Sequence, residues 1–144
     1  MRQGELEKKR DRKFELIEKE VSVMVFICYP KCTTCQKAKA YLNSSGVQYE
    51  QRDIKGNNPS YDELKAWFDI SGLPIKKFFN TSGMAYKALN LKDKLPAMSV
   101  DDCLRLLSTD GMLVKRPMLI GEDFVLVGFK QDDWKAVLPF REKV

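Results

Sequence analysis

Two cysteines separated by two residues are the first feature of this 144-residue sequence that could do chemistry. They are Cys32 and Cys35, with Thr33 and Thr34 between them and Lys31 before them. A cysteine at the N-terminal end of a helix faces unpaired backbone N–H groups and the positive end of the helix dipole, and both favour the thiolate. We expect Cys32 to occupy that position. Cys35 would then lie at the same end of the first turn, where it can attack a mixed disulfide on Cys32 and close an internal disulfide.

The other two cysteines, Cys28 and Cys103, allow different interpretations of the motif. Inert buried thiols are one alternative, and a zinc site built from the four cysteines is another. Zinc sites of the C-x₂-C type usually have a second close pair elsewhere, which this chain lacks, so redox chemistry is favoured. We interpret Cys28 and Cys103 as core residues, and a distant resolving role for Cys103 is the alternative. The chain contains no histidine, which removes Cys–His and Ser–His–Asp activation.

Composition limits the class of protein. A chain that is 44% hydrophobic and 31% charged fits one globular domain with an adequate core. The net charge of +5 is too small and too dispersed along the sequence to indicate nucleic acid by itself, so we expect no direct DNA binding. No apolar run reaches the length of a membrane span, and the N-terminus is charged where a secretory signal is apolar. We therefore expect no membrane association and a cytoplasmic location, which also suits a chain without a dense disulfide framework.

The segment around the two cysteines is expected to form a strand, a helix and a second strand. The short apolar run at 23–28 is typical of a buried central strand, and Pro30 ends it. Apolar residues at helical spacing follow, and the helix is expected to stop near Gly46. Residues 47–54 then form the second strand. Because parallel strands need a crossover, these three elements predict a βαβ unit.

The rest of the chain is expected to hold a helical insertion, a hairpin and a last helix. The patterns S-x-x-E at 60–63 and S-x-x-D at 99–102 each open a helix, and the apolar clusters at 73–96 have no strand period. Two short apolar runs flank a Gly-Glu-Asp turn at 118–127 and predict a β-hairpin. The last helix is expected to start near Asp132 and to end by Pro139.

These elements predict an α/β protein with a thioredoxin-like fold, in the order βαβ, helical insertion, ββα, and with a mixed four-stranded sheet. We place this domain at 23–140 and its helical insertion at about 58–110. Residues 1–22 form a charged N-terminal extension. A natural start at Met24 is one hypothesis for this extension, which would then not belong to the native protein.

Arg116 and Pro117 form the second conspicuous pair, just before the hairpin. In thioredoxin-like folds a cis-proline at this point lies against the active cysteines, which makes a cis Pro117 a family expectation. Arg116 would then be brought to the dithiol, where a guanidinium lowers the pKa of Cys32 and binds anions through a fork of donors. The alternative is a surface arginine before a turn.

The motifs at four places in the chain resemble the ArsC/Spx family. They are Tyr-Pro-Lys-Cys-Thr-Thr-Cys-Gln-Lys-Ala at 29–38, Lys-Lys-Phe-Phe-Asn-Thr-Ser-Gly at 76–83, Lys-Arg-Pro-Met-Leu-Ile at 115–120 and Val-Gly-Phe at 127–129. This bacterial family, in the glutaredoxin/thioredoxin superfamily, contains glutaredoxin-linked arsenate reductases and Spx-type transcriptional regulators. The likeness runs from about Met24 to Leu138.

The resemblance to arsenate reductases implies a nucleophile at Cys32 and three arginines that hold the oxyanion. Only Arg116 matches one of these arginines; the second falls on Asn80 and the third on Gly128. A lone arginine would neutralise an arsenate adduct poorly, so arsenate reduction is the lesser alternative.

The resemblance to Spx-type regulators implies a CxxC redox switch and binding to the C-terminal domain of the RNA polymerase α subunit. Val-Gly-Phe and the acidic start of the last helix look more like this branch. Residues 79–83, however, lack the arginine expected in the insert of the regulators, and no basic DNA-reading helix is apparent. The alternative function is therefore a redox-sensing regulator that binds RNA polymerase.

Our interpretation is a thiol–disulfide oxidoreductase in which Cys32 attacks, Cys35 resolves and Arg116 supports the thiolate. We assign supporting or substrate-binding roles to four further residues, namely Lys31, Thr33, Pro117 and Asn80. We expect no cofactor and no metal, with electrons supplied by glutathione and glutaredoxin or by thioredoxin, that is, by a small thiol or a redox protein. We also expect a monomer.

Overall fold

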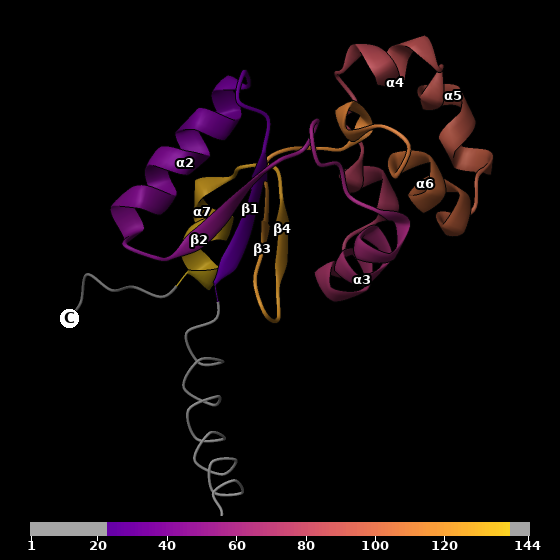
Figure 1. Cartoon of the computed structure of the whole chain (residues 1–144). Coiled ribbons are helices and arrows are strands. Elements are labelled where there is room, and N and C mark those ends of the chain that lie inside the picture. Colours follow the sequence, from indigo (N-terminus) through magenta and orange to yellow (C-terminus); the bar gives the residue numbers. More distant parts are fainter. Residues whose placement is uncertain (1–22, 139–144) are drawn as a thin grey trace, which may run out of the picture.

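A mixed four-stranded sheet lies at the centre of the molecule, in a computed structural model that describes residues 23–138 (Figure 1). The strand order is β2-β1-β3-β4. The strands are β1 (Met24–Cys28), β2 (Tyr49–Asp53), β3 (Met118–Ile120) and β4 (Val125–Val127). β1 pairs in parallel with β2 and antiparallel with β3, and β3 pairs antiparallel with β4. The sheet and its connections confirm the predicted thioredoxin-like class, whereas the predicted extension at 1–22 lies outside the described residues.

The βαβ unit forms where the sequence predicts it, with slightly shorter strands. Helix α2 (Thr33–Ser45) buries Cys35, Ala38 and Leu42, which lie three and four residues apart and therefore share one face. The helix ends at Gly46, whose φ of +74° lies in the left-handed region that glycine adopts without cost. β2 covers 49–53 rather than 47–54, and three of its five residues are exposed, as suits an edge strand.

The regular elements of the insertion between β2 and β3 are all helical, apart from an isolated β-bridge between Phe79 and Val114. Its elements are α3 (Tyr61–Ser71), η1 (Ile75–Phe78), α4 (Met84–Ala88), α5 (Leu91–Lys94), η2 (Leu95–Ala97), α6 (Val100–Leu107) and η3 (Gly111–Leu113). The predicted capping box is present: the Glu63 N–H donates to Ser60 Oγ at 3.1 Å, and the Ser60 N–H donates to Glu63 Oε1 at 3.0 Å. Ser99 caps α6 in the same way, by accepting the Asp102 N–H at 3.0 Å.

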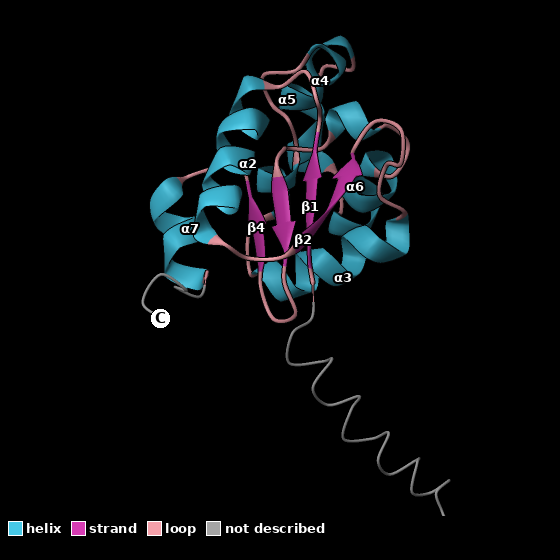
Figure 2. Ribbon diagram, turned by 60° about the vertical axis from the view of Figure 1, so that its left-hand side comes forward, coloured by secondary structure: helices cyan, strands magenta, loops and turns pink. Residues whose placement is uncertain are grey.

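Helices cover both faces of the sheet (Figure 2). On one face, α2 and α7 (Gln131–Val137) enclose a cluster that includes Phe26, Leu42 and Trp134. On the other, the insertion encloses a larger cluster that includes Ile27 and Met118. Phe26 and Ile27 are neighbours in β1 and are both fully buried, because successive strand residues point to opposite faces and this strand is covered on both.

The last helix starts at Gln131, one residue before the predicted position, and is anchored by Trp134. The indole N–H of Trp134 donates to the Gly128 C=O at 3.0 Å, so the buried ring fixes the start of α7 against the end of β4. Among residues 23–138, every helix is too short or too polar to cross a membrane.

Candidate active site

Cys32 and Cys35 lie at the N-terminal end of α2, as predicted. Cys32 is the residue that precedes the helix, with φ −91° and ψ 123°, and its N–H donates to the Tyr29 C=O at 2.9 Å. Its own C=O accepts the Gln36 N–H at 3.1 Å, which closes the first helical turn. Cys32 is half-buried, whereas the side chain of Cys35 is fully buried. Both sulfurs are free thiols in this structure.

Opposing influences act on the pKa of Cys32. Burial is the largest of them and raises the pKa. Four groups lower the pKa, namely the backbone N–H and the thiol of Cys35, the backbone N–H of Thr34 and the positive charge of Arg116. Together these groups outweigh burial and lower the pKa of Cys32 below its ordinary value. Cys32 is therefore the thiol with nucleophilic character.

Cys35 has the opposite acid–base behaviour. Burial raises the pKa of Cys35 to about 12, helped by its hydrogen bond to Cys32 and by the negative charge there. The Tyr29 N–H donates to Cys35 Sγ at 3.3 Å. This hydrogen bond lowers the pKa of Cys35, but by less than burial raises it. Cys35 thus holds its proton and donates a hydrogen bond to the neighbouring sulfur.

The peptide bond between Arg116 and Pro117 is cis, as the family resemblance implies. The Arg116 guanidinium carbon lies 5.2 Å from the centroid of the Tyr29 ring, a cation–π distance. One of its nitrogens, Nη1, lies 3.4 Å from the Met112 C=O and 3.5 Å from the Val114 C=O. Because Tyr29 also contacts the dithiol, these contacts hold the guanidinium beside it, rather than in the alternative position on an open surface.

Cys28 and Cys103 are core residues, with 2% and 1% of their surface exposed. Burial raises the pKa of both thiols. Cys28 ends β1, and Cys103 lies in α6, within the separate cluster on the other face of the sheet. Among residues 23–138, no three Cys, Asp or Glu side chains form a group that could hold a metal ion, so the four-cysteine zinc alternative has no ligand cluster there.

Three of the predicted supporting residues have few contacts with the dithiol. Lys31 and Thr33 flank Cys32 in the chain and are exposed. The Asn80 N–H donates to the Leu113 C=O at 2.8 Å. The Asn80 side chain packs against Gly83, because its nitrogen would lie only 2.5 Å from a Cβ at that position. The structure thus brings Arg116 close to the dithiol, places the cis Pro117 directly after it in the chain, and leaves the Asn80 amide within the insertion.

The backbone conformation at Gly128 favours glycine. The resemblance to arsenate reductases places one of their three arginines at this position. The φ of Gly128 is +80°, which side-chain-bearing residues rarely adopt. Its N–H donates to the Pro117 C=O at 2.8 Å, so this turn supports the cis-proline directly. An arginine at this position would be strained.

Sequence reasoning missed two contributors to the site, Tyr29 and Thr34. Both act through backbone N–H groups, Tyr29 on Cys35 and Thr34 on Cys32. Tyr29 also supplies the ring that contacts Arg116. The position of Tyr29 directly before the Pro30 strand break was the only signal available, because backbone donors leave no trace in residue type.

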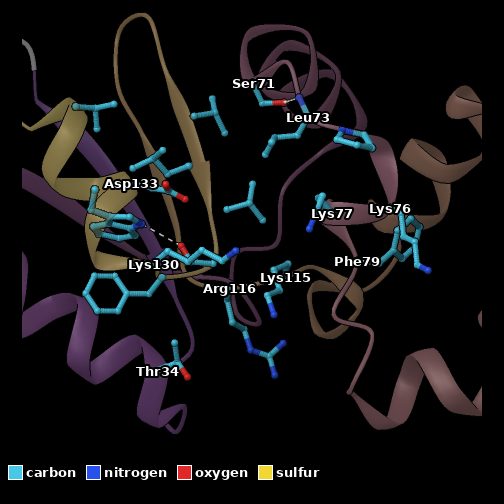
Figure 3. Close-up of a pocket in the computed structure, with 18 of the residues that line it drawn as sticks. Thr34, Ser71, Leu73, Lys76, Lys77, Phe79, Lys115, Arg116, Lys130 and Asp133 are labelled. Atoms are coloured by element: carbon cyan, nitrogen blue, oxygen red, sulfur yellow. Dashed lines mark hydrogen bonds between the residues drawn. The ribbon is translucent and has the colours of Figure 1, made fainter.

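A cleft of about 920 Å³ opens beside the dithiol (Figure 3). Thr34 and Arg116 line it at the dithiol end, and Ser71 and Leu73 line it at the opposite end. The walls are formed by β4 and α7 on one side and by η1 on the other.

The model of the ArsC family matches residues 28–137. The chain belongs to the ArsC family. Uncharacterized protein YusI of Bacillus subtilis is 51% identical over 112 residues, which are 78% of this chain and 95% of YusI. Global transcriptional regulator Spx of Enterococcus faecalis is 31% identical over 111 residues, 76% of this chain and 82% of Spx. An ArsC family related protein from Bacteroides fragilis has a crystal structure that matches with a TM-score of 0.79 and 50% identity, over 82% of this chain and 99% of that one.

These similarities confirm the ArsC/Spx resemblance drawn from the motifs. They include a transcriptional regulator and a relative without a described activity, so family membership leaves open what the dithiol does.

Proposed function

We propose that this ArsC-family protein is a thiol–disulfide oxidoreductase in which Cys32 is the nucleophile and Cys35 the resolving thiol. The observation that carries the proposal is the inequality of two adjoining thiols. One is half-buried at a helix N-terminus with a lowered pKa, and the other is fully buried, protonated and hydrogen-bonded to the first. Two buried thiols with a purely structural role would not need to differ in exposure and in pKa.

In the first step, the Cys32 thiolate attacks one sulfur of a substrate disulfide. A bond forms between Cys32 Sγ and that sulfur, the substrate S–S bond breaks, and the other half leaves as a thiolate that takes a proton from water. The product is a mixed disulfide on Cys32. The lowered pKa of Cys32 increases the fraction of thiolate, which is the reacting form.

In the second step, Cys35 loses its proton and attacks Cys32 Sγ. The bond to the substrate breaks, the second substrate thiol leaves, and an internal 32–35 disulfide forms, so two electrons have passed from the dithiol to the substrate. The Cys32 negative charge and hydrogen bond that raise the pKa of Cys35 disappear once Cys32 is in a mixed disulfide. The pKa of Cys35 is therefore lower after the first step than before it, although burial continues to raise it.

A reductant must then restore the dithiol by the same two exchanges in reverse. We propose glutathione with glutaredoxin, or thioredoxin, as the source of these electrons, since each offers a thiol for the exchange.

Arsenate is a poor fit for the site. The described part of the chain holds three arginines, of which Arg52 pairs with Glu63 and Arg105 pairs with Asp101. Only Arg116 acts on Cys32. Stabilising a multiply charged oxyanion adduct takes more fixed positive charge than one guanidinium supplies.

Steady-state reduction of hydroxyethyl disulfide tests the proposal, with glutathione and glutaredoxin or with thioredoxin and its reductase as electron source. We expect turnover by the wild type and none by Cys32→Ser, with Cys35→Ser slowed strongly and stalled as a mixed disulfide. Turnover of arsenate should be far slower than that of the disulfide. Absence of wild-type disulfide turnover with both electron sources contradicts the proposal.

A redox-sensing regulator is the second candidate, favoured by the 31% identity to global transcriptional regulator Spx. In that case the same dithiol would oxidise once and alter a binding surface. A pull-down against the C-terminal domain of the RNA polymerase α subunit, with the protein reduced and oxidised, separates the two candidates. Redox-dependent binding without disulfide turnover supports the regulator; turnover without binding supports the enzyme.

A further inference from the structure

The cleft beside the dithiol carries an unusual concentration of positive charge. Five cationic side chains and one carboxylate line it, namely Lys76, Lys77, Lys115, Arg116, Lys130 and Asp133. This excess of four positive charges is nearly the whole net charge of the chain, +5. None of the four lysines forms a salt bridge with a residue in the described range 23–138.

Two of these lysines, Lys77 and Lys130, approach the cleft from opposite sides (Figure 3). Lys77 extends from η1 and Lys130 from the start of α7, and both point toward the open space between them, with Lys115 and Arg116 nearer the dithiol. Like charges that face each other across a gap repel, and a bound anion removes that repulsion. The arrangement therefore favours a ligand with several negative charges along its length.

The cleft also has an apolar wall. Leu126 and Val127 line it from β4, Phe129 from the turn after β4 and Val137 from α7, and Leu73 lines it from the segment that follows α3. A small polyanion such as a phosphate group would leave this wall in water. A ligand that combines negative charges with apolar groups uses both parts of the cleft.

β4 adds a third feature, because it is an edge strand. Gly121 and Gly128 donate backbone hydrogen bonds across the hairpin to Phe124 and Pro117. In an antiparallel pair, hydrogen-bonded and non-bonded positions alternate, so the N–H and C=O of Val127 face away from β3. Val127 lines the cleft, and an extended peptide can bond to such an edge.

We infer that the substrate disulfide is presented by an extended protein segment that carries both acidic and apolar side chains and lies in this cleft along β4. The acidic side chains pair with Lys77, Lys115 and Lys130, and the disulfide reaches Cys32 at the Arg116 end. This inference rests on the proposed oxidoreductase function and names the substrate class for it.

Peptides with one cysteine in a mixed disulfide with thiopyridine test the inference. Three versions share their apolar residues and carry Glu, Gln or Lys at the charged positions. Release of thiopyridone by the reduced protein gives the rate constant for attack by Cys32. We expect the Glu peptide to react about tenfold faster than the Gln peptide and the Lys peptide to be slowest, with the differences reduced in high salt. Replacing the apolar residues of the Glu peptide by serine should slow it as well.

Two double variants locate the effect. Lys77→Glu with Lys130→Glu should abolish the preference for the Glu peptide over the Lys peptide. Lys92→Glu with Lys94→Glu changes the net charge equally on α5, outside the cleft, and should keep most of the preference. Loss of the preference in both double variants would mean that net charge alone steers the peptide, which overturns the inference.

Hydroxyethyl disulfide and oxidised glutathione complete the test. If the protein reduces hydroxyethyl disulfide but treats the three peptides alike, the inference is wrong and the oxidoreductase function stands. If it reduces neither hydroxyethyl disulfide nor any peptide, the oxidoreductase function itself fails. If oxidised glutathione reacts as fast as the Glu peptide, the cleft serves a small anionic disulfide and the protein segment is excluded.

Discussion

At the dithiol, two identical side chains differ in acidity because their surroundings differ. Cys32 receives backbone and side-chain hydrogen bonds at the helix N-terminus, whereas Cys35 is enclosed between α2 and the sheet. The pKa values of the two thiols depend on each other. The protonated Cys35 thiol lowers the pKa of Cys32, and the interaction with Cys32 raises the pKa of Cys35. The nucleophile and the resolving thiol are therefore assigned by burial and not by residue type.

Arg116→Ala should raise the pKa of Cys32, because it removes a positive charge that favours the thiolate. The rate of alkylation by iodoacetamide, followed against pH, should reach its midpoint at a higher pH than in the wild type. Arg116→Lys should fall between the two, since it keeps the charge and loses the planar contact with Tyr29. Lys92→Ala serves as the control. An unchanged midpoint in Arg116→Ala would show that the guanidinium does not act on the thiolate.

Cys35→Ala should raise the pH midpoint of alkylation further than Arg116→Ala does, because the Cys35 thiol lowers the pKa of Cys32 more than the charge of Arg116 does. Cys35→Ser retains a donor at the same place and should stay closer to the wild type. A midpoint in Cys35→Ala at or below that of the wild type would contradict the proposed hydrogen bond between the thiols.

The residue types of the site were readable in the sequence, and its backbone donors were not. A CxxC spacing after an apolar strand locates Cys32 and Cys35, and an Arg-Pro before a hairpin locates the second half of the site. Tyr29 and Thr34 contribute N–H groups, which every residue except proline has. Asn80 was placed in the site by alignment, and its amide instead lies against Gly83.

Among the elements, the junction of β4 and α7 holds three parts of the site together. Gly128 donates to the Pro117 C=O and accepts from the Trp134 indole, so the cis-proline, the hairpin and the last helix meet at one residue. Its positive φ is what lets the chain turn there.

Gly128→Ala should lower the free energy of unfolding by about 1 kcal/mol or more, because alanine is strained at a positive φ. Gly128→Asn should cost less, since asparagine tolerates the left-handed region better. Urea denaturation measures both. Equal losses in the two variants would point to crowding against Lys115, whose Cε would lie 3.3 Å from a Cβ at this position, rather than to backbone strain.

The elements that were predicted well are those with a local signal. The capping patterns located the starts of α3 and α6, and Gly46 located the end of α2. The segment at 73–96 could be recognised only as helical in general. Its helices α4 and α5 have five and four residues, too few for a helical period to show.

Over the whole molecule, Arg52 and Glu63 join the sheet to the insertion. Two Arg52 nitrogens donate to the two Glu63 carboxylate oxygens, each at 2.8 Å, and so connect β2 to α3. The hydrogen bonds from Arg52 are the main reason that the pKa of Glu63 falls from 4.5 to about 2.

Stability should therefore decrease as the pH is lowered through this range. A carboxylate with a depressed pKa in the folded state stabilises the fold fully above its unfolded pKa, and this contribution is lost between about 4.5 and about 2. Glu63→Gln keeps the capping function and removes the charge, so its free energy of unfolding should change less across the same pH range. Urea midpoints of the wild type and Glu63→Gln, measured at several pH values, check this. An identical dependence of the midpoint on pH in both proteins would contradict it.

The positive cleft is a property of the folded molecule and not of any one segment. Its cations come from 76–77, 115–116 and 130, which is why the charge looked dispersed along the sequence. Folding brings these segments to one side of the hairpin, beside the dithiol (Figure 3). The family and fold could be read from motifs, whereas this grouping required the tertiary structure.

The mass of the protein after a single exposure of the reduced form to hydroxyethyl disulfide tests the roles of the two thiols directly. We expect a wild-type product lighter by two hydrogen atoms, with the new disulfide mapped between Cys32 and Cys35. We also expect a stable mercaptoethanol adduct on Cys32 in Cys35→Ser and no adduct at either position in Cys32→Ser. A wild type that keeps the adduct on Cys32, or a Cys32→Ser variant that reacts through Cys35, would contradict the roles of nucleophile and resolving thiol.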